Sequence, residues 1–343
     1  MKHAFPQTRY QGSKAKLLDW IWYQMADLDF NTCLDVFGGT GAVAYRLKQE
    51  RKQVTYNDYL RFNHLMASAL IENSTETLSD EDVEWLVSEH GEIKYTDLVE
   101  RIFPDIYFTN EENRWIDQTL SNMRHLDGAY KFEIAFFALA QACIIKRPYN
   151  LFHRKNLYVR MADVERSFGN KITWDRPFED YFKKFAQEAN SAVFSNGYSH
   201  NAFNFDAFEV PGNYDLVYID TPYIAKSGTG VDYRDFYHFL EGMTKYDEWE
   251  SSIDVASKHK RLLPFENVWN DKNKITDGFE RLFQKFQDSI IVVSYRSDGI
   301  PSEIALMQLL KKYKQSVTVH HFGTYKYVLS RNNESKEVLL IGT

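Results

Sequence analysis

The sequence is short of cysteine and of long apolar runs, and each shortage excludes a class of protein. Only two of the 343 residues are cysteines, and Cys33 and Cys143 both stand among apolar residues. We therefore expect two buried thiols, with neither a disulfide framework nor a cysteine-based metal site. The longest apolar stretch covers residues 132–145 and carries a Glu and a Gln. It is too short to cross a bilayer, so it predicts a buried helix.

The sequence also lacks an excess of positive charge. It has 41 Lys and Arg against 48 Asp and Glu, which gives a net charge of −7 at pH 7. A surface that binds nucleic acid would therefore have to be a local concentration of basic residues. The first ten residues, MKHAFPQTRY, contain no apolar segment of the kind found in secretory signals. We expect no signal peptide and a cytoplasmic location.

Two familiar nucleotide-binding motifs are missing, although a glycine-rich turn is present. An apolar strand over residues 32–37 runs directly into GGTG at 38–41, and residues 42–49 continue with helical spacing. The glycines match neither the G-x-G-x-x-G fingerprint nor the G-K-[ST] ending of a P-loop. With the strand that follows at 53–58 they form one βαβ unit of a parallel sheet, whose helix N-terminus suits an anion.

Asp58 ends this second strand, about twenty residues after the glycine turn. An acid at this place can bond the two hydroxyls of a ribose, although a helix N-cap is the alternative. Turn and acid together indicate a cofactor that contains a nucleoside and has an anionic far end. Both NAD and S-adenosylmethionine satisfy this description.

The order of the predicted elements indicates an α/β fold with an insertion. Helical spacing dominates from about residue 60 to 190, and strand character returns afterwards. The returning strands are expected at 191–194, 215–220, 289–295, 316–327 and 336–342, the last two as a hairpin across 331–336. We predict a sheet domain at 1–61 and 191–343, split by a mainly helical insert at 62–190.

The stretch DLVYIDTPYI, residues 215–224, places a carboxylate at the end of an apolar strand. Asp220 closes the strand, and Thr221, Pro222 and Tyr223 follow. Ligands of open α/β sheets bind at the carboxyl ends of the strands, so this position predicts a working site. The alternative is that Asp220 caps a following helix and Tyr223 packs in the core.

Three segments follow one another along the chain: RYQGSK at 9–14, LDVFGGTGAVA at 34–44 and DTPY at 220–223. In this order they resemble the Dam-type, or alpha-group, DNA adenine-N6 methyltransferases. The resemblance implies a Rossmann-like fold that uses S-adenosylmethionine, with 62–190 as a target-recognition insert. Methylation of RNA or of a small amine, a DNA-binding module with a vestigial cofactor pocket, and a nicotinamide oxidoreductase are the alternatives.

The resemblance also implies a role for each matching residue. The positions implied to contact the cofactor are Tyr10, Gly12, Ser13, Lys14, Asp35, Phe37, Gly38, Gly39, Gly41, Asp58, Asp206 and Asp220. Lys14 is expected near the carboxylate of the methionine end and Asp206 near the adenine ring, with a turn acid as the alternative for Asp206. The tetrad Asp220, Thr221, Pro222 and Tyr223 is implied to receive the target adenine, without a metal. The family usually has proline where this chain has Thr221.

A local concentration of basic residues lies in the predicted insert. Between 146 and 171 there are seven basic residues and two acidic ones, with aromatic residues between them. Such a cluster can follow phosphates, and Asn side chains can read base edges, although a solvated charged face is the alternative. The residues expected to contact double-stranded DNA are Arg147, Asn150, Arg154, Lys155, Asn156 and Arg160. By resemblance, a cognate restriction endonuclease is a possible partner.

Overall fold

The computed structural model describes residues 3–164, 170–225, 228, 230–324 and 335–343. By its internal contacts the chain forms two compact units. The helical unit comprises Met1–Tyr10, Ser68–Ser195 and Tyr233–Pro264, and the sheet unit comprises Gln11–Ala67, Asn196–Asp232 and Phe265–Thr343. The segment 233–264, which the sequence analysis assigned to the sheet domain, thus lies in the helical unit.

The sheet unit is built on a seven-stranded mixed sheet with the order β3-β2-β1-β4-β6-β9-β8. The first five of these strands pair in parallel, whereas β9 is antiparallel to β6 and to β8. The strands are β1 Thr32–Asp35, β2 Gln53–Asn57, β3 Asn201–Phe203, β4 Leu216–Ile219, β6 Ile290–Arg296, β8 Val317–Thr324 and β9 Lys336–Gly342. A small second sheet pairs β5 Ile224–Ala225 with β7 Gly299–Ile300.

This arrangement confirms the predicted α/β class and the Rossmann-like sheet. It also confirms that the last two strands form an antiparallel edge. Residues 331–334 of the predicted hairpin turn lie outside the described residues.

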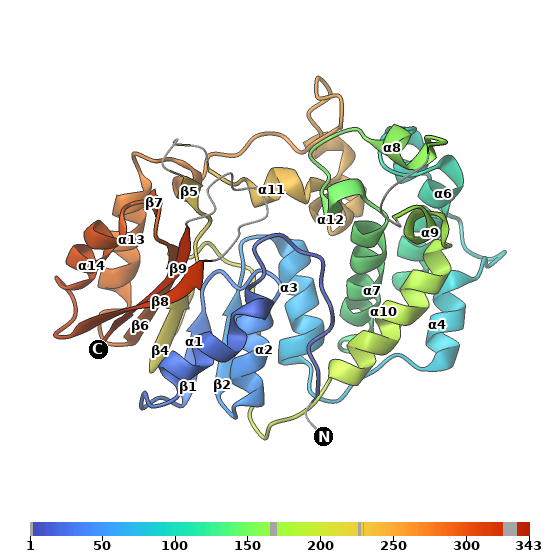
Figure 1. Cartoon of the computed structure of the whole chain (residues 1–343). Helices are drawn as coiled ribbons and strands as arrows, with labels where there is room; N and C mark the ends of the chain where they lie inside the picture. The colour runs from blue at the N-terminus through green and yellow to red at the C-terminus, as the bar shows by residue number, and fades with distance from the viewer. Residues whose placement is uncertain (1–2, 165–169, 226–227, 229, 325–334) are drawn as a thin grey trace. The chain divides into compact units, whose positions relative to one another are not determined.

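Helices cover both faces of the sheet, as Figure 1 shows for α13 and α14 on one side and α1 and α2 on the other. The apolar side, under α13 and α14, includes the fully buried residues Leu34, Val217, Val293 and Leu340. Each of these residues comes from a different strand of the sheet. Successive side chains of a strand point to opposite faces, so the next residue in each strand faces the other side of the sheet. The helices of this unit are α1 Leu18–Met25, α2 Ala42–Gln49, α3 Arg61–Ala67, α13 Ile275–Lys285 and α14 Glu303–Leu310, with short 3-10 helices at Lys14–Lys16 and Val268–Asn270.

Polar residues occupy the other face of the same strands, at the edge where the parallel strands end. Asp35 is the last residue of β1, Asp220 follows β4, and Ser294 lies in the second half of β6. Because β9 runs antiparallel to β6, its beginning lies at this same edge, and its second residue is Glu337. Each of these residues neighbours an apolar-side position in its strand, so the alternation turns all four side chains toward the α1 and α2 side.

The helical unit surrounds a helix that is buried on nearly every side. Helix α7 has every residue from Ile134 to Ile145 buried, and α10 packs along it with an apolar face. This confirms the buried helix predicted at 132–145. The helices are α4 Asp80–Val87, α5 Leu98–Ile102, α6 Asn110–Met123, α7 Lys131–Ile145, α8 Leu157–Met161, α9 Asn170–Asp175, α10 Phe178–Ala192, α11 Tyr233–Phe236 and α12 His238–Met243, with a π-helix at Ser68–Glu72 and 3-10 helices at Pro148–Asn150, Tyr246–Glu248 and Glu250–Ser252.

Two further expectations concern the apolar interior. Cys33 and Cys143 are both buried free thiols, as predicted. Within the described ranges, every helix is too short or too polar to cross a bilayer.

Candidate active site at the carboxyl edge of the sheet

The glycine turn between β1 and α2 is shaped by an aromatic ring packed against it. A Cβ atom on Gly38 would lie 2.0 Å from the ring of Tyr56, so only glycine fits at this position. The Tyr56 hydroxyl donates to the carbonyl of Gly39 over 2.7 Å, which ties β2 to the turn. Gly39 and Gly41 have φ of 51° and 80°, the left-handed region that glycine adopts without strain. The turn is thus held close to β2.

Asp58, at the end of β2, is bound to the same turn. Its Oδ2 accepts from the Gly39 N–H over 2.8 Å and its Oδ1 from the Leu60 N–H over 2.8 Å. Burial raises the pKa of Asp58 to about 6, while these backbone donors oppose the rise. The Asn63 side chain also donates to this carboxylate. Two carboxylate oxygens offer about four acceptor sites in all, so acceptor capacity remains for a further donor. The carboxylate therefore orders the turn and can still bind a hydroxyl group.

Asp35, the last residue of β1, is a buried carboxylate with one unused oxygen. It accepts a hydrogen bond from the backbone of Ala44, in the first turn of α2, while Oδ1 has no partner among the described residues. Burial, followed by the charges of Asp220 and Asp58, raises the pKa of Asp35 well above its ordinary value. Three carboxylates thus act on one another here, and an unpaired oxygen in such a place suits a positively charged donor.

Asp220 lies in a polar cluster with the charged groups of Lys14 and Glu337 and the hydroxyl of Tyr223. The Lys14 ammonium is 3.2 Å from Asp220 Oδ1 and 2.8 Å from Glu337 Oε1, and it also contacts the Tyr223 hydroxyl. That hydroxyl lies 2.9 Å from Asp220 Oδ1 and 3.1 Å from Glu337 Oε1. Asp220 is therefore joined to Lys14, 206 positions earlier in the chain.

The charged groups of this cluster shift one another's pKa values. Burial raises the pKa of Asp220 to about 6, Lys14 opposes that rise, and Glu337 adds to it. Burial alone would lower the pKa of Lys14, but the two carboxylates hold it above its ordinary value. Lys14 therefore stays charged at neutral pH, and Asp220 is mainly ionised there.

The rest of the tetrad is partly enclosed. Thr221 is 2% exposed, and its hydroxyl has no partner among the described residues. The ring of Tyr223 meets Tyr295 edge to face at 5.2 Å, and Pro222 is half-buried. Asp220 and Tyr223 are directed into one cluster and Asp220 caps no helix, since the short strand β5 follows the tetrad.

The remaining predicted cofactor residues are spread more widely. Ser13 lies 3.4 Å from the hydroxyl of Thr40 in the glycine turn, and Gly12 beside it has φ of 83°. Phe37 meets Trp269 edge to face at 4.9 Å. Asp206 is exposed, and its Oδ1 accepts from the Phe208 N–H over 2.9 Å, which is the geometry of a turn acid.

Tyr10 belongs to the helical unit and is described there. Its ring stacks on Tyr237 at 4.5 Å and on Tyr233 at 5.6 Å, both within 10° of parallel. Tyr233 and Tyr237 come from the segment DYRDFYHFLEG that follows the tetrad, so the first sequence motif and that segment share one aromatic stack.

Comparison with known proteins decides between the cofactors that a glycine turn and an acid at the end of β2 allow. Residues 10–297 match the family of D12 class N6 adenine-specific DNA methyltransferases. The chain belongs to this family. The resemblance to Dam-type enzymes is confirmed, and with it S-adenosylmethionine as the cofactor and DNA as the substrate.

Individual relatives of this methyltransferase are enzymes of the type II class. The chain is 30% identical to Type II methyltransferase M2.HphI of Haemophilus parahaemolyticus, covering 98% of this chain and 97% of the relative. It is 22% identical to Type II methyltransferase M.NlaIII of Neisseria lactamica, covering 95% of each. Type II methyltransferase M.FokI of Planomicrobium okeanokoites is 25% identical over 96% of this chain, which spans 51% of that longer protein.

The basic cluster of the methyltransferase's helical unit divides into internal and exposed residues. Arg147, 1% exposed, donates to the carbonyls of Tyr107 and Leu151, each over 3.2 Å, and to the side chain of Asn156. Burial lowers the pKa of Arg147 to about 9. Asn156 is itself only 6% exposed. The structure thus gives Arg147 and Asn156 a role inside the unit, in place of the DNA contact expected from the sequence.

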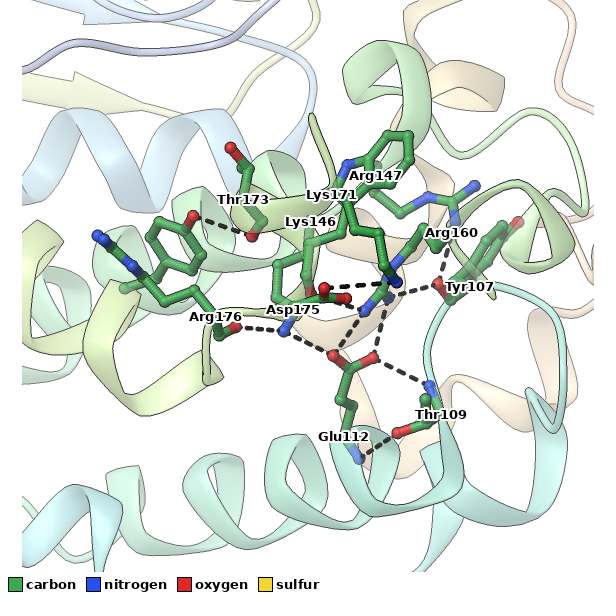
Figure 2. A network of polar contacts seen from close by, with 12 residues as sticks. Tyr107, Thr109, Glu112, Lys146, Arg147, Arg160, Lys171, Thr173, Asp175 and Arg176 are labelled. Carbon is green, nitrogen blue, oxygen red and sulfur yellow. Dashed lines mark hydrogen bonds and ion pairs between the residues drawn. The ribbon is translucent and has the colours of Figure 1, made fainter. Parts of the chain in front are cut away.

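Arg160 is also internal, within the network drawn in Figure 2. It binds Glu112 through both terminal nitrogens, over 2.9 and 2.6 Å, and is 4% exposed. Lys146 binds the same carboxylate at 2.6 Å, and the N–H of Glu112 donates to Thr109 in a capping box at the start of α6. Arg160 and Lys146 are thus bound to Glu112 inside the unit. Like Arg147, Arg160 has an internal role in place of the DNA contact expected from the sequence.

The exposed members of the cluster are the ones available to a ligand. Arg154 and Lys155 are exposed, and Asn150 is half-buried. Tyr149 is 80% exposed, and both it and Asn150 have positive φ, of 63° and 58°. Two consecutive non-glycine residues in this strained region are unusual, and such strain concentrates at functional sites. Two of the charged residues counted between 146 and 171, Glu165 and Arg166, lie outside the described residues.

Proposed function

We propose that Asp220 and the backbone carbonyl of Thr221 accept the two hydrogens of the exocyclic amine of a flipped adenine. The lone pair of this amine is delocalised into the ring, so the nitrogen is a poor nucleophile. Acceptors at both hydrogens draw it toward a tetrahedral, more nucleophilic form, and they bind more strongly as positive charge develops on it. A base inside a duplex cannot reach such a site, so it must first leave the stack.

The residues at the carboxyl edge fit the cofactor of the family. The sulfonium of S-adenosylmethionine supplies a methyl group that is already activated. In this proposal Asp58 binds the ribose with the acceptor capacity that Gly39, Leu60 and Asn63 leave free. The unpaired Oδ1 of Asp35 receives the ammonium of the methionine end. The other predicted contacts, at Tyr10, Gly12, Ser13, Phe37, Gly38, Gly39, Gly41 and Asp206, stay proposals from the family resemblance.

Lys14 receives a different role from the one the resemblance implies. Its ammonium lies between the carboxylates of Asp220 and Glu337 and contacts the hydroxyl of Tyr223. An ammonium with two carboxylate partners is already neutralised, so we assign Lys14 to the arrangement of Asp220 and not to the carboxylate of the cofactor. The bonds to its hydroxyl also hold the far end of Tyr223, and the edge-to-face contact with Tyr295 restricts the rotation of the ring that is proposed to stack on the base.

DNA recognition is assigned to the helical unit and to its exposed residues. Arg154 and Lys155 are proposed to contact phosphates, and Asn150 to read a base edge. The exposed ring of Tyr149 is well suited to stack on a base or to enter a duplex. The segment predicted as a recognition insert, 62–190, lies mostly in this unit, which supports the assignment.

We further propose a restriction–modification setting with a cognate endonuclease and a cytoplasmic location. The support is that the relatives M2.HphI, M.NlaIII and M.FokI are named type II methyltransferases. The endonuclease is not required for methyl transfer, because the acceptors and the proposed cofactor contacts all come from this chain.

The observation that carries the proposal is the convergence of Asp220, Tyr223 and Lys14 at the edge of the sheet where Asp35 and Asp58 also end their strands. Its test is to express the protein in a host whose DNA lacks N6-methyladenine and to sequence the genomic DNA for modified adenines. Wild type should modify adenine within one recurring sequence, and Asp220→Ala should leave the DNA unmodified. Modification by Asp220→Ala at the wild-type level would refute the role of Asp220.

A further inference from the structure

Glu337 is a buried carboxylate at the site that none of the sequence motifs includes. It lies on β9, beyond the residues 10–297 that match the family, and its side chain is fully buried. Burying a charged carboxylate carries a large free-energy cost unless it is paired and hydrogen-bonded. The groups that bind Glu337 therefore indicate its purpose.

One oxygen of Glu337 takes three donors. Oε1 lies 2.8 Å from the Lys14 ammonium, 3.1 Å from the Tyr223 hydroxyl and 2.6 Å from the Ser294 hydroxyl. The first two donors also reach Asp220 Oδ1, at 3.2 and 2.9 Å. Glu337 and Asp220 thus share an ammonium and a hydroxyl, while Ser294 on the neighbouring strand β6 belongs to Glu337.

We propose that Glu337 is a positioning residue for methyl transfer, which holds Lys14 and Tyr223 so that neither is committed to Asp220 alone. The proposal rests on the role proposed for Asp220. An ammonium paired with Asp220 alone would neutralise more of the charge of this carboxylate and make it a weaker acceptor for the adenine amine. A second carboxylate draws the ammonium partly away and keeps Asp220 available as an acceptor. It also holds the Tyr223 hydroxyl, and with it the far end of the ring.

Several charged and titratable groups surround Glu337, and each bears on the pH dependence. Lys14 comes from the 3-10 helix Lys14–Lys16, and Tyr218, Asp220 and Tyr223 come from β4 and the tetrad after it. Its register partner on β6 is Arg296, and on β8 it is the uncharged Phe322. Asp35 acts on Asp220 from β1. Among these groups Glu337 raises the pKa of Asp220, whereas Lys14 lowers it.

The test is the pH profile of kcat for Glu337→Gln. Glutamine keeps an acceptor for Tyr223 and Ser294 but removes the negative charge, so Lys14 pairs with Asp220 alone. We expect kcat on the plateau to fall roughly tenfold, and the acid limb to move to lower pH by about one unit, because a neighbouring charge shifts a carboxyl pKa by that order. KM for the cofactor and for DNA should hardly change. Glu337→Ala, which also releases Tyr223, should lower kcat further.

A matched control and a second variant separate this proposal from its alternatives. Glu266→Gln makes the same chemical change at a side chain of the sheet unit that is 96% exposed, and it should leave kcat and the profile unchanged. Wild-type kcat and an unmoved acid limb in Glu337→Gln would overturn the proposal. So would a loss of activity that only follows a lower melting temperature, with the profile unmoved. Asp220→Asn tests the underlying role, since retention of the acid limb in that variant would refute Asp220 whatever Glu337 does.

Discussion

At the scale of single residues, the role proposed for Asp220 makes activity depend on the charge of its side chain. The carboxylate must be ionised to accept hydrogens from the amine, and burial raises its pKa to about 6 in spite of Lys14. The ionised form is present above that pH and is lost as the pH falls through it. We predict that kcat/KM, which reports the free enzyme, declines tenfold per pH unit below about pH 6.

The pH prediction is checked by steady-state rates from pH 5 to 8 at substrate concentrations well below KM. Asp220→Asn keeps an amide oxygen that does not titrate, so its lower activity should show no such limb. A wild-type profile that is flat through pH 5 would contradict the assignment.

Asp58 should act on cofactor binding more than on turnover. Its carboxylate is buried and holds two backbone N–H groups, so its removal both loosens the glycine turn and deletes the acceptors for ribose. Hydrogen bonds to a charged group contribute about 1.5–3 kcal/mol, which corresponds to a rise of about 10- to 150-fold in Kd for Asp58→Ala. Calorimetric titration with S-adenosylmethionine measures this.

The comparison variant for Asp58 is Asp19→Ala, on a side chain of the same unit that is 97% exposed. Its Kd should equal that of wild type. If Asp58→Ala binds the cofactor as tightly as Asp19→Ala, Asp58 is not part of the cofactor site.

Sequence reasoning located the residues of this site unevenly. Asp58 and Asp220 each end a strand, a position that marks them from sequence alone. Arg147 and Arg160 were expected on the surface because they are basic, but buried carbonyls and Glu112 bind them, and those partners are distant in sequence. Pairing of this kind is a tertiary property that a count of charges in one segment does not contain.

At the scale of elements, the turn between β1 and α2 depends on the strand beside it. A Cβ on Gly38 would lie 2.0 Å from the ring of Tyr56, whose hydroxyl is bound to Gly39. We predict that Gly38→Ala displaces this ring, destabilises the protein by about 1–3 kcal/mol and weakens cofactor binding. Urea denaturation and cofactor titration measure the two effects.

The control for this turn is Gly323→Ala on β8, where a Cβ would meet no atom within 4 Å. It should change the free energy of unfolding by no more than about 0.5 kcal/mol. Equal stability of the two variants would show that the packing of Tyr56 does not restrict the turn.

The strand β9 shows what element order adds to sequence reading. KEVLLIG was recognised as a strand, but its Glu337 was not recognised as a site residue. Glu337 is the second residue of its strand, whereas the site residues that a sequence marks are those at the ends of strands. In an antiparallel strand the beginning lies at the carboxyl edge of its parallel neighbours, and the pairing of β9 with β6 was needed to see this.

At the scale of the whole molecule, a net charge of −7 coexists with binding to a polyanion. We proposed that the exposed residues Arg154 and Lys155 supply the local attraction. We predict that Arg154→Ala and Lys155→Ala each weaken DNA binding and reduce the slope of log K against log salt by about 1. Binding isotherms at several salt concentrations measure this slope.

Two comparison variants serve as controls for the DNA-binding measurement. Lys184→Ala removes an exposed basic side chain from α10 and should leave the slope unchanged. Arg147→Ala should instead lower the free energy of unfolding, by about 1.5–3 kcal/mol, because its carbonyl partners lose a charged donor. Unchanged slopes in Arg154→Ala and Lys155→Ala would show that these residues do not contact phosphates.

The central claim is that a carboxylate and a neighbouring peptide carbonyl at the edge of the sheet make the adenine amine reactive. Single-turnover methyl transfer to duplex DNA, at saturating cofactor and DNA, isolates this step from binding. The account predicts that Asp220→Ala binds S-adenosylmethionine with a Kd close to that of wild type but transfers the methyl group roughly 10²–10³ times more slowly. A transfer rate equal to that of wild type in this variant would contradict it.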